Sequence, residues 1–498
     1  MNKSIKTVSF MMIATFFSKI AGLLRDIFIA AKYGTETMEA VAYSYASSLP
    51  VQLFDFTLGA AVLATFIPIF NSYMEKGEKK RAYEFSNNFI NIVVLISATI
   101  SVIGMLFSKQ IGFIIAPELD YETQLLLQKL IIIVLPTTIF TTLAYAFVGI
   151  LQSLGEFNIP AIISMVSNLV IIAYLLFFDN VYGLCIAMLV GWAMQFIIQI
   201  PSLIKKKYNY KFSLNFKDAG IREAMVLAIP ILASSWVQPI SVFVNKRYAS
   251  AILGGGPALD YANRFYIIVV GVFVLAITNY IFPALSKKMG SNDSRGFGEI
   301  IIQSIRVMLL VIAPVCAGMI ILSDDIIMLV YGRGEFTEYS IKLTSTALRF
   351  FSFGMIGYGI NEILNKSFYS MKNAKIPMIA SVCGIITSII LSSISMKVWN
   401  WGVAGLAISS TISTFAVSII LITFINNNVK IICKNILVFT VKVFFSVLVM
   451  TIVIVALKHV LLNANLLIRV SITAICGALL YVFMLYILRI DEVREVIK

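Results

Sequence analysis

Charge is scarce in this chain of 498 residues. Asp, Glu, Lys and Arg together make up 13% of the sequence, whereas hydrophobic residues make up 59%, and the mean hydropathy is +0.93. A soluble protein normally carries about 25% charged residues, and one of this length normally divides into about two or three domains. The shortage of charge excludes an ordinary soluble fold and indicates a protein that is surrounded by lipid.

Histidine and cysteine are too few to build the common metal or catalytic sites. His459 is the only histidine, and no two of the five cysteines have metal-ligand spacing. The sequence also lacks a phosphate-binding loop, a dinucleotide fingerprint and a nucleophile elbow. We therefore expect no cofactor, no metal site and no ATP hydrolysis, and we expect the cysteines to be buried as small hydrophobic residues.

Long apolar runs fill the chain instead. Each of the 14 runs is long enough to cross a bilayer, which takes about 20 residues, and the lipid core favours helices because it offers no water to backbone groups. We predict an all-α polytopic membrane protein with 14 transmembrane helices, the first of which is retained because no small-residue cleavage site ends it. The runs cover residues 4–32, 38–73, 82–116, 121–154, 157–178, 181–204, 222–252, 256–288, 297–330, 339–371, 376–396, 401–425, 431–457 and 463–489.

The formal net charge of +14 is concentrated in the loops of one side of this arrangement. Loops on the other side are acidic or poor in charge, which is the pattern of the positive-inside rule across an even number of spans. We therefore expect both termini in the cytoplasm and contact of the cations with anionic lipid headgroups, not with nucleic acid. The basic residues on this side are Lys3, Lys6, Lys76, Lys79, Lys80, Arg81, Lys205, Lys206, Lys207, Lys211, Lys217, Arg222, Lys287, Lys288, Arg295, Lys372, Lys375, Lys430, Lys434, Arg494 and Lys498.

Two segments of the first half recur in the second half. Residues 151–160 resemble residues 368–377, at an offset of 217 (377 − 160), and residues 66–68 correspond to 281–283, at an offset of 215 (283 − 68). Each copy would hold six spans, and six is even, so the copies share one orientation as parallel repeats. The pattern predicts two six-helix lobes related by a pseudo-two-fold axis, with a cavity between them that opens alternately to either side.

The duplication also predicts the domain organisation. Helices 13 and 14 lie outside the repeats, and they could line a groove for a lipid tail or serve only as structural packing. The expected parts are an N-terminal lobe (1–204), a cytoplasmic basic linker (205–221), a C-terminal lobe (222–425), and helices 13 and 14 with a cytoplasmic tail (426–498).

Three charged residues stand out inside apolar runs. Arg25 and Asp26 lie in the first run and Arg264 lies in the eighth. An ionised side chain at mid-membrane costs roughly 2.5–3.5 kcal/mol on insertion scales, and a guanidinium group cannot avoid this cost by losing its proton. These groups should therefore face a hydrated cavity or a partner, and arginines in a cavity suit a phosphate-bearing ligand. The alternatives are an ion pair between Arg25 and Asp26, and snorkelling of Arg264 to the outer interface.

Lys19 and Gly22 share a helical stripe with Asp26. Lys19 is a candidate ligand for the same phosphate, although it could instead snorkel to an interface. Gly22 permits a close approach of another backbone, or a bend.

Asp55 is another intramembrane carboxylate of the first half. It could neutralise Arg25 or bind a proton or a cation, and the sequence does not choose between these roles. Pro50 and Pro239 interrupt helix hydrogen bonding in spans 2 and 7, so we expect hinges there.

Several segments match a known family in order through both halves, namely residues 18–34, 49–50, 261–265, 271–276, 331–336 and 368–370 with Pro377. On these segments the chain resembles the MurJ (MviN) lipid II flippase family, which is part of the MOP exporter superfamily. The resemblance implies 14 transmembrane helices and a cationic central cavity in the bacterial cytoplasmic membrane. It implies transport of an undecaprenyl-diphosphate-linked disaccharide-pentapeptide from the inner to the outer leaflet, with a possible functional link to cell-wall polymerases.

The resemblance implies that Arg25, Asp26 and Arg264 bind the diphosphate or gate its passage, and that Lys19 stands where a basic residue is usual. The chain also departs from the family pattern: Asp55 is present and the usual arginine after Leu49-Pro50 is absent.

Several functions therefore stay open. The leading one is lipid II translocation, and a related one is the transport of a capsular, exopolysaccharide or teichoic precursor on the same kind of lipid. A multidrug cation antiporter should have carboxylates in its cavity in place of arginines. A membrane-embedded glycosyltransferase or polymerase should have an acidic catalytic residue on a sizeable outer loop, and the outer loops here are short.

Overall fold

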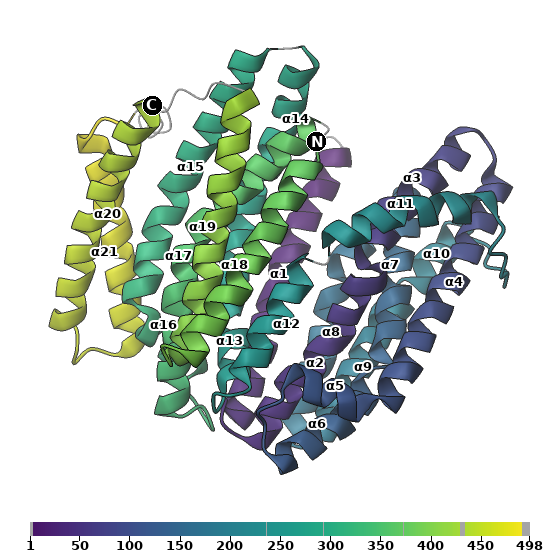
Figure 1. The fold of residues 1–498 in the computed structure, drawn as a ribbon, viewed down its shortest axis with the longest axis horizontal. Coiled ribbons are helices and arrows are strands. Elements are labelled where there is room, and N and C mark those ends of the chain that lie inside the picture. Colours follow the sequence, from purple (N-terminus) through teal and green to yellow (C-terminus); the bar gives the residue numbers. More distant parts are fainter. Residues whose placement is uncertain (1–2, 236, 292, 372, 429–433, 491–498) are drawn as a thin grey trace. The chain divides into compact units, whose positions relative to one another are not determined.

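The computed structural model describes residues 3–235, 237–291, 293–371, 373–428 and 434–490, and no strand occurs among them (Figure 1). Two of the helical segments, η1 and η2, are π-helical. The elements are α1 (Lys3–Tyr33), α2 (Met38–Phe54), η1 (Asp55–Gly59), α3 (Ala60–Glu75), α4 (Lys79–Leu106), α5 (Ser108–Ile115), α6 (Tyr121–Val134), α7 (Thr137–Ser153), α8 (Asn158–Phe177), α9 (Val181–Ile197), α10 (Ile200–Lys205), α11 (Ala219–Ser235), α12 (Val237–Ala249), α13 (Gly255–Val269), η2 (Val270–Val274), α14 (Leu275–Gly290), α15 (Ser294–Ile321), α16 (Ser323–Tyr331), α17 (Glu338–Ser370), α18 (Lys375–Lys397), α19 (Gly402–Asn428), α20 (Lys434–Val460) and α21 (Leu466–Ile487).

The expected all-helical membrane fold is confirmed. Within the described ranges, 10 helical stretches are long and apolar enough to cross a bilayer. Several expected spans are not single regular helices; the run 38–73, for example, consists of α2, η1 and α3. The total of 14 spans and the repeat arrangement stay predictions.

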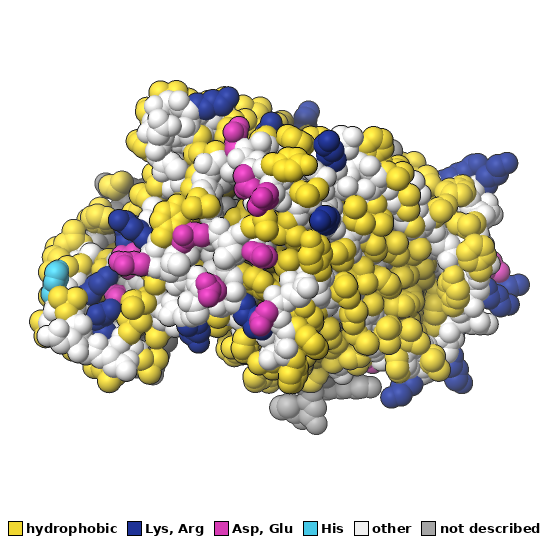
Figure 2. Space-filling model, turned by 90° about the horizontal axis from the view of Figure 1, so that it is seen from below, with side chains coloured by type: hydrophobic (Ala, Val, Ile, Leu, Met, Phe, Trp, Pro, Cys, Tyr) yellow, Lys and Arg dark blue, Asp and Glu magenta, His cyan; other side chains and the backbone are white. Residues whose placement is uncertain are grey.

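The surface of the protein is strongly apolar. Leu106, Phe177 and Val460 are 75%, 79% and 78% exposed, and Figure 2 shows wide hydrophobic areas on the surface that it draws. Exposed apolar area on this scale would drive a soluble protein to associate. Lipid is the solvent in which such a surface is stable, so the chain is a multi-pass membrane protein.

The chain divides into two compact units, Met1–Pro257 and Ala258–Lys498. In unit 1, α1 packs along α8, α2 packs on α6, and α3 packs on α4 and α11. Buried apolar residues form clusters in the described part of unit 1. One contains Tyr45 and Leu127, and another contains Phe66, Phe85 and Phe89, whose rings lie 5.2–5.8 Å apart.

In unit 2, α17 lies at the centre of the packing and contacts α15, α16 and α19. The last two described helices, α20 and α21, pair with each other, and α20 packs on α15. Phe439, Met450 and Tyr481 belong to the apolar cluster that joins them to the unit, and the Tyr481 hydroxyl donates to the carbonyl of Leu310 at 3.0 Å.

This division by packing differs from the lobes expected from the repeats. Helices α11 and α12 follow the linker, but α11 packs on α3 and α12 packs on α5, within unit 1. Packing and duplication are separate properties of a chain. The expected lobes at 1–204 and 222–425 concern duplication and therefore stay a prediction.

The two π-helical segments occur at matching places. Asp55–Gly59 interrupts the helix between α2 and α3, and Val270–Val274 interrupts the helix between α13 and α14. Their offset is 215 (270 − 55), the same as that of the Phe66–Pro68 and Ile281–Pro283 segments. A π-helical turn replaces part of the regular hydrogen-bond ladder and often marks a kink or a functional site.

Candidate functional site

Arg25 and Asp26 lie side by side on α1 and form an ion pair. Arg25 Nη2 and Nε lie 2.7 and 2.9 Å from Asp26 Oδ1, and Arg25 Nη1 donates to Asn168 Oδ1 of α8 at 3.0 Å. The Arg25 side chain is 23% exposed and that of Asp26 is 8% exposed. The ion pair that was one of the sequence alternatives is therefore present, and Asn168 orients the guanidinium group from a second helix.

The stripe of α1 that precedes Arg25 also faces α8. Ser18 Oγ donates to the carbonyl of Ala161 at 3.5 Å, and a Cβ added at Gly22 would lie 3.5 Å from Asn168 Nδ2. That distance is an ordinary contact, so the approach of α8 does not by itself require glycine. Lys19 is half-buried on the same helix.

The far end of α1 is also attached to the α8 region. Lys32 Nζ forms an ion pair with Asp179 and donates to the carbonyl of Phe178 at 2.8 Å, while the Tyr33 hydroxyl donates to the carbonyl of Asp179 at 2.7 Å. Helix α1 is thus held against α8 from Ser18 to Tyr33, and Arg25 lies within a well-fixed helix.

Asp55 occupies a helix interruption, and Pro50 lies inside the helix that precedes it. Asp55 is half-buried at the first position of η1, next to Phe54, whose ring stacks on that of Tyr145 at 5.1 Å. Pro50 is buried inside α2, five residues before η1 (55 − 50). Pro239 belongs to α12, and its side chain lies outside the described part of the protein.

Arg264 belongs to unit 2, where it lies half-buried on α13. Aromatic residues on the same helix pack onto α16 and α17. The Tyr261 ring lies 4.9 Å from that of Tyr331, and the Tyr266 ring lies 5.9 Å from that of Tyr358. These contacts hold the helix that carries Arg264. Arg25 and Arg264 lie in different units, and their joint role stays a prediction.

Lys246 of α12 is a buried cation that the sequence analysis missed. It is 6% exposed, its Nζ donates to the carbonyl of Ser44 at 2.8 Å, and the Tyr45 hydroxyl donates to the carbonyl of Lys246 at 2.9 Å. These bonds fasten α12 to α2. The available signal was that Lys246 and Arg247 lie at the expected outer end of span 7, where the positive-inside rule does not place cations.

A cavity of about 490 Å³ in unit 1 is lined by four carboxylates, Glu36, Glu118, Asp120 and Glu122. The Thr123 side chain and backbone N–H donate to Asp120 and hold the pKa of this carboxyl below its usual value. Carboxylates repel a diphosphate. This cavity is therefore not a candidate for the anionic part of the substrate.

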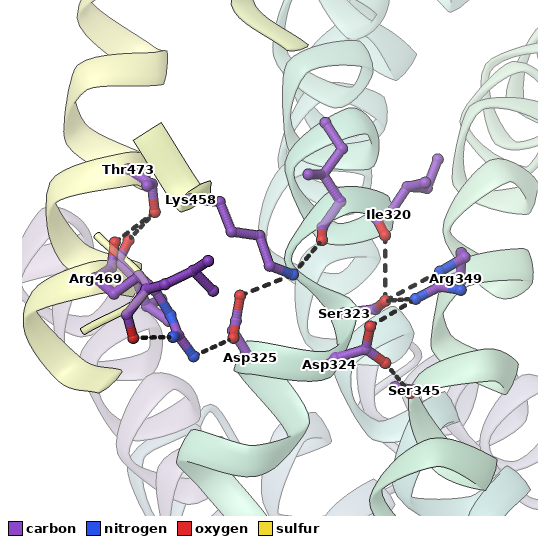
Figure 3. A network of polar contacts seen from close by, with 12 residues as sticks. Ile320, Ser323, Asp324, Asp325, Ser345, Arg349, Lys458, Arg469 and Thr473 are labelled. Carbon is purple, nitrogen blue, oxygen red and sulfur yellow. Dashed lines mark hydrogen bonds and ion pairs between the residues drawn. The ribbon is translucent and has the colours of Figure 1, made fainter. Parts of the chain in front are cut away.

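A second charged cluster, here called the Asp325 network, fastens the last two helices to unit 2 (Figure 3). Asp325 Oδ2 lies 2.9 Å from Lys458 Nζ of α20, and its Oδ1 lies 2.6 Å from Arg469 Nη2 of α21. The adjacent Asp324 pairs with Arg349 of α17 at 2.8 Å. Lys458 and Arg469 make the attachment of these helices ionic as well as apolar.

The fold and the charged first helix define a polytopic helical membrane protein. The solved structure of an inward-facing multidrug resistance MATE family transporter of the MOP superfamily aligns with a TM-score of 0.72, at 14% identity over 86% of this chain and 98% of that chain.

Comparison with protein families identifies the family to which the chain belongs within this class. The family model of the Lipid II flippase MurJ matches residues 29–475, and the chain belongs to that family. The solved Lipid II flippase MurJ in an inward closed conformation aligns with a TM-score of 0.81 at 25% identity, over 98% of this chain and 99% of that chain.

Relatives with the same description extend over most of the chain. The Lipid II flippase MurJ of Thermosipho africanus is 27% identical over 405 residues, which are 80% of this chain and 81% of the relative. The probable lipid II flippase MurJ of Rickettsia prowazekii is 26% identical over 493 residues, or 96% of each chain. The resemblance stated from the sequence is therefore confirmed at the level of the family.

Proposed function

We propose that this chain moves lipid II, the undecaprenyl-diphosphate-linked peptidoglycan precursor, from the inner to the outer leaflet of the bacterial cytoplasmic membrane. The observation that carries this proposal is the family match over residues 29–475. The chain acts as a transporter, and 14 spans in two parallel repeats would place both termini in the cytoplasm. The equal offset of the two π-helical segments supports the duplication.

Arg25, Lys19 and Arg264 bind the diphosphate during transport in this proposal, and Asp26 gates its passage. Arginine presents a planar set of N–H donors that matches phosphate oxygens. In unit 1, Asp26 and Asn168 already orient the Arg25 guanidinium group, and its 23% exposure leaves part of the side chain accessible.

Asp26 supplies a gating step. A carboxylate and a diphosphate compete for the same guanidinium donors, so an arriving diphosphate displaces Asp26 from Arg25 and Asp26 recaptures Arg25 on release. The substrate is thereby held in transit without a permanent unpaired charge in the apolar span, which would be costly.

The helix interruptions supply the movement in the same scheme. Pro50 and η1 lie together in the second expected span, and Gly22 and Pro239 are the other candidate hinges. Asp55 begins η1, and in this scheme it would lie close to the path of the headgroup. Alternating access then results from bending at these points while the packed helices stay rigid.

Arginine substitutions test the site. Arg25→Ala and Arg264→Ala should each abolish growth of cells depleted of their own flippase, at unchanged protein level, and Arg25→Lys should rescue only in part because lysine lacks the bidentate geometry. Arg222→Ala, which changes an exposed arginine of unit 1, is the matched control and should grow normally. Full growth of both alanine variants would exclude this site.

A further inference from the structure

The segment that joins α10 to α11 in unit 1 is fixed to α4 by side-chain hydrogen bonds. This segment, residues 206–218, is called the strap below. Asn87 Nδ2 of α4 donates to the carbonyl of Asn209 at 3.2 Å, and Asn91 Nδ2 donates to the carbonyl of Ser213 at 2.9 Å. The backbone N–H of Asn215 donates to Asn88 Oδ1 at 2.9 Å. Three asparagines of one helix therefore provide the strap with hydrogen bonds that a regular element would obtain from its own backbone.

Two tyrosines of the strap complete this attachment. The Tyr208 hydroxyl donates to Asn87 Oδ1 at 2.7 Å and lies 2.8 Å from Ser86 Oγ, and the Tyr210 hydroxyl donates to Asn91 Oδ1 at 2.6 Å. Ser86 is fully buried, and Asn87 is 3% exposed. The strap is thus a positioned part of unit 1, and its outward-facing side chains are presented in a defined place.

The side chains that the strap presents are apolar. Phe212 is 74% exposed, Phe216 is 50% exposed and Leu214 is 43% exposed. They recur at every second position of the segment. Contact of two phenylalanines and a leucine with water would be unfavourable. The hydrogen bonds between the strap and α4 leave these three side chains uncovered.

Cations surround these apolar side chains. Lys205, Lys207, Lys211 and Lys217 are all exposed, while Asp218 is engaged at the start of α11, where its Oδ1 accepts from the backbone N–H of Ile221 at 3.1 Å. Aromatic rings with lysines beside them suit the boundary between the acyl chains and anionic headgroups of a bilayer.

We propose that the strap is an interfacial anchor, with Phe212, Leu214 and Phe216 inserted among the lipids and the lysines bound to anionic headgroups. The partner is therefore a lipid surface that contains anionic phospholipid. Only the assignment to the cytoplasmic leaflet rests on the orientation in the proposed function. Because α4 holds the strap, the anchor also determines how deep in the membrane the segment before α11 lies.

Spin-label accessibility in vesicles tests this proposal. Phe212→Cys and Phe216→Cys, made in the full chain, are labelled with a nitroxide and reconstituted in phosphatidylcholine vesicles with or without phosphatidylglycerol. The wild-type chain is labelled in parallel to subtract native cysteines. Both labels should collide more with oxygen than with a water-soluble nickel complex. Lys76→Cys, on the exposed turn between α3 and α4, is the matched aqueous control and should show the reverse.

The lysines are tested by the dependence on lipid charge. Phosphatidylglycerol should deepen the label at position 212, and the double substitution Lys211→Gln with Lys217→Gln should remove that dependence. A label at 212 that behaves like the one at 76 overturns the anchor, and exclusion of both collision reagents overturns it in favour of a second copy of the chain. A depth that does not respond to phosphatidylglycerol overturns the assignment to anionic lipid. Translocation by the Arg25→Ala variant tests the proposed function separately.

Discussion

At the scale of single residues, Arg25 shows how a neighbouring helix determines what a charged side chain can do. Its sequence neighbour Asp26 supplies one acceptor, but Asn168, 143 residues away, supplies the other. A hydrogen bond to a charged group contributes roughly 1.5–3 kcal/mol. Asn168 is therefore a positioning residue for the cation that is proposed to bind the diphosphate.

Substitution of Asn168 should weaken transport without removing the cation. Asn168→Leu removes the hydrogen bond from Arg25 Nη1 to Asn168 Oδ1, and we expect translocation to fall by roughly one order of magnitude, which corresponds to about 1.4 kcal/mol. The measurement is the rate of lipid II appearance in the outer leaflet at matched protein level.

Ser167→Ala is the control for this prediction. Ser167 precedes Asn168 on α8, and its hydroxyl accepts a hydrogen bond from Gln195 Nε2 at 2.7 Å. An equal loss of transport in both variants would show that α8 packing, and not the orientation of Arg25, is responsible.

The sequence reveals Arg25 and Asp26 because charge inside an apolar run is costly and rare. It does not reveal Asn168, because a neutral polar residue in a helix has many ordinary roles. It also does not reveal the buried position of Lys246, because a cation near a span end is usually explained by snorkelling. In both cases the missing information is which helix lies opposite.

At the scale of elements, the attachment of α20 and α21 combines an apolar cluster with the Asp325 network (Figure 3). The Asp325 side chain is 7% exposed, and those of Arg469 and Lys458 are 14% and 26% exposed. Removal of one partner from a buried ion pair is strongly destabilising because the other charge is left uncompensated. One carboxylate here balances two cations.

Neutralising Asp325 should therefore destabilise the protein far more than neutralising its neighbour. Asp325→Asn should lower the free energy of unfolding by an amount near the lower end of roughly 3–5 kcal/mol, since Asn can still accept a hydrogen bond. Asp324→Asn breaks a pair whose side chains are 49% and 38% exposed, so we expect a change of about 0–1 kcal/mol.

Thermal unfolding of the two variants in detergent measures this difference. Equal melting temperatures would show that the network is not what holds α20 and α21. A triple substitution of Asp325→Leu, Lys458→Met and Arg469→Leu provides a further check. It should recover most of the lost stability, because apolar residues of similar volume can replace a buried charged cluster.

Helix existence is the part of the element scale that the sequence predicts well. Apolar runs of membrane length must form helices in lipid, and the described residues confirm this fold. The interruptions at Asp55–Gly59 and Val270–Val274 were not predicted. Neither segment contains proline, and a π-helical turn depends on how the flanking helices are held rather than on a residue signal.

At the scale of the whole molecule, the family match over residues 29–475 and the strongly apolar surface define a lipid-transporting membrane protein. The absence of an arginine after Leu49-Pro50 is where this chain departs from the expected pattern of cations. A site with fewer cations would select less strongly for the diphosphate. The identity of the carried glycan is therefore the property that most needs a direct test.

Depletion of this protein should trap lipid II in the inner leaflet. We expect leaflet-specific labelling of lipid II from outside the cell to fall severalfold while total lipid II rises, because synthesis continues when translocation stops. A parallel measurement of capsular, exopolysaccharide and teichoic lipid intermediates is the control. Accumulation of one of these instead of lipid II would assign the transporter to that other glycan.

The sequence alone determined that this protein lies in a membrane, that it is helical, which loops carry its cations and which charged residues stand inside its spans. These properties follow from the cost of moving charge and unpaired backbone into lipid, and that cost depends on composition and run length. The tertiary structure decided which partners the charges have: Asn168 for Arg25, Ser44 for Lys246, and two helices for Asp325. The strap was decided in the same way, because its hydrogen bonds come from a helix more than 100 residues earlier (209 − 87 = 122). Such pairings depend on which helices pack together, and apolar faces of similar composition do not specify that in the sequence.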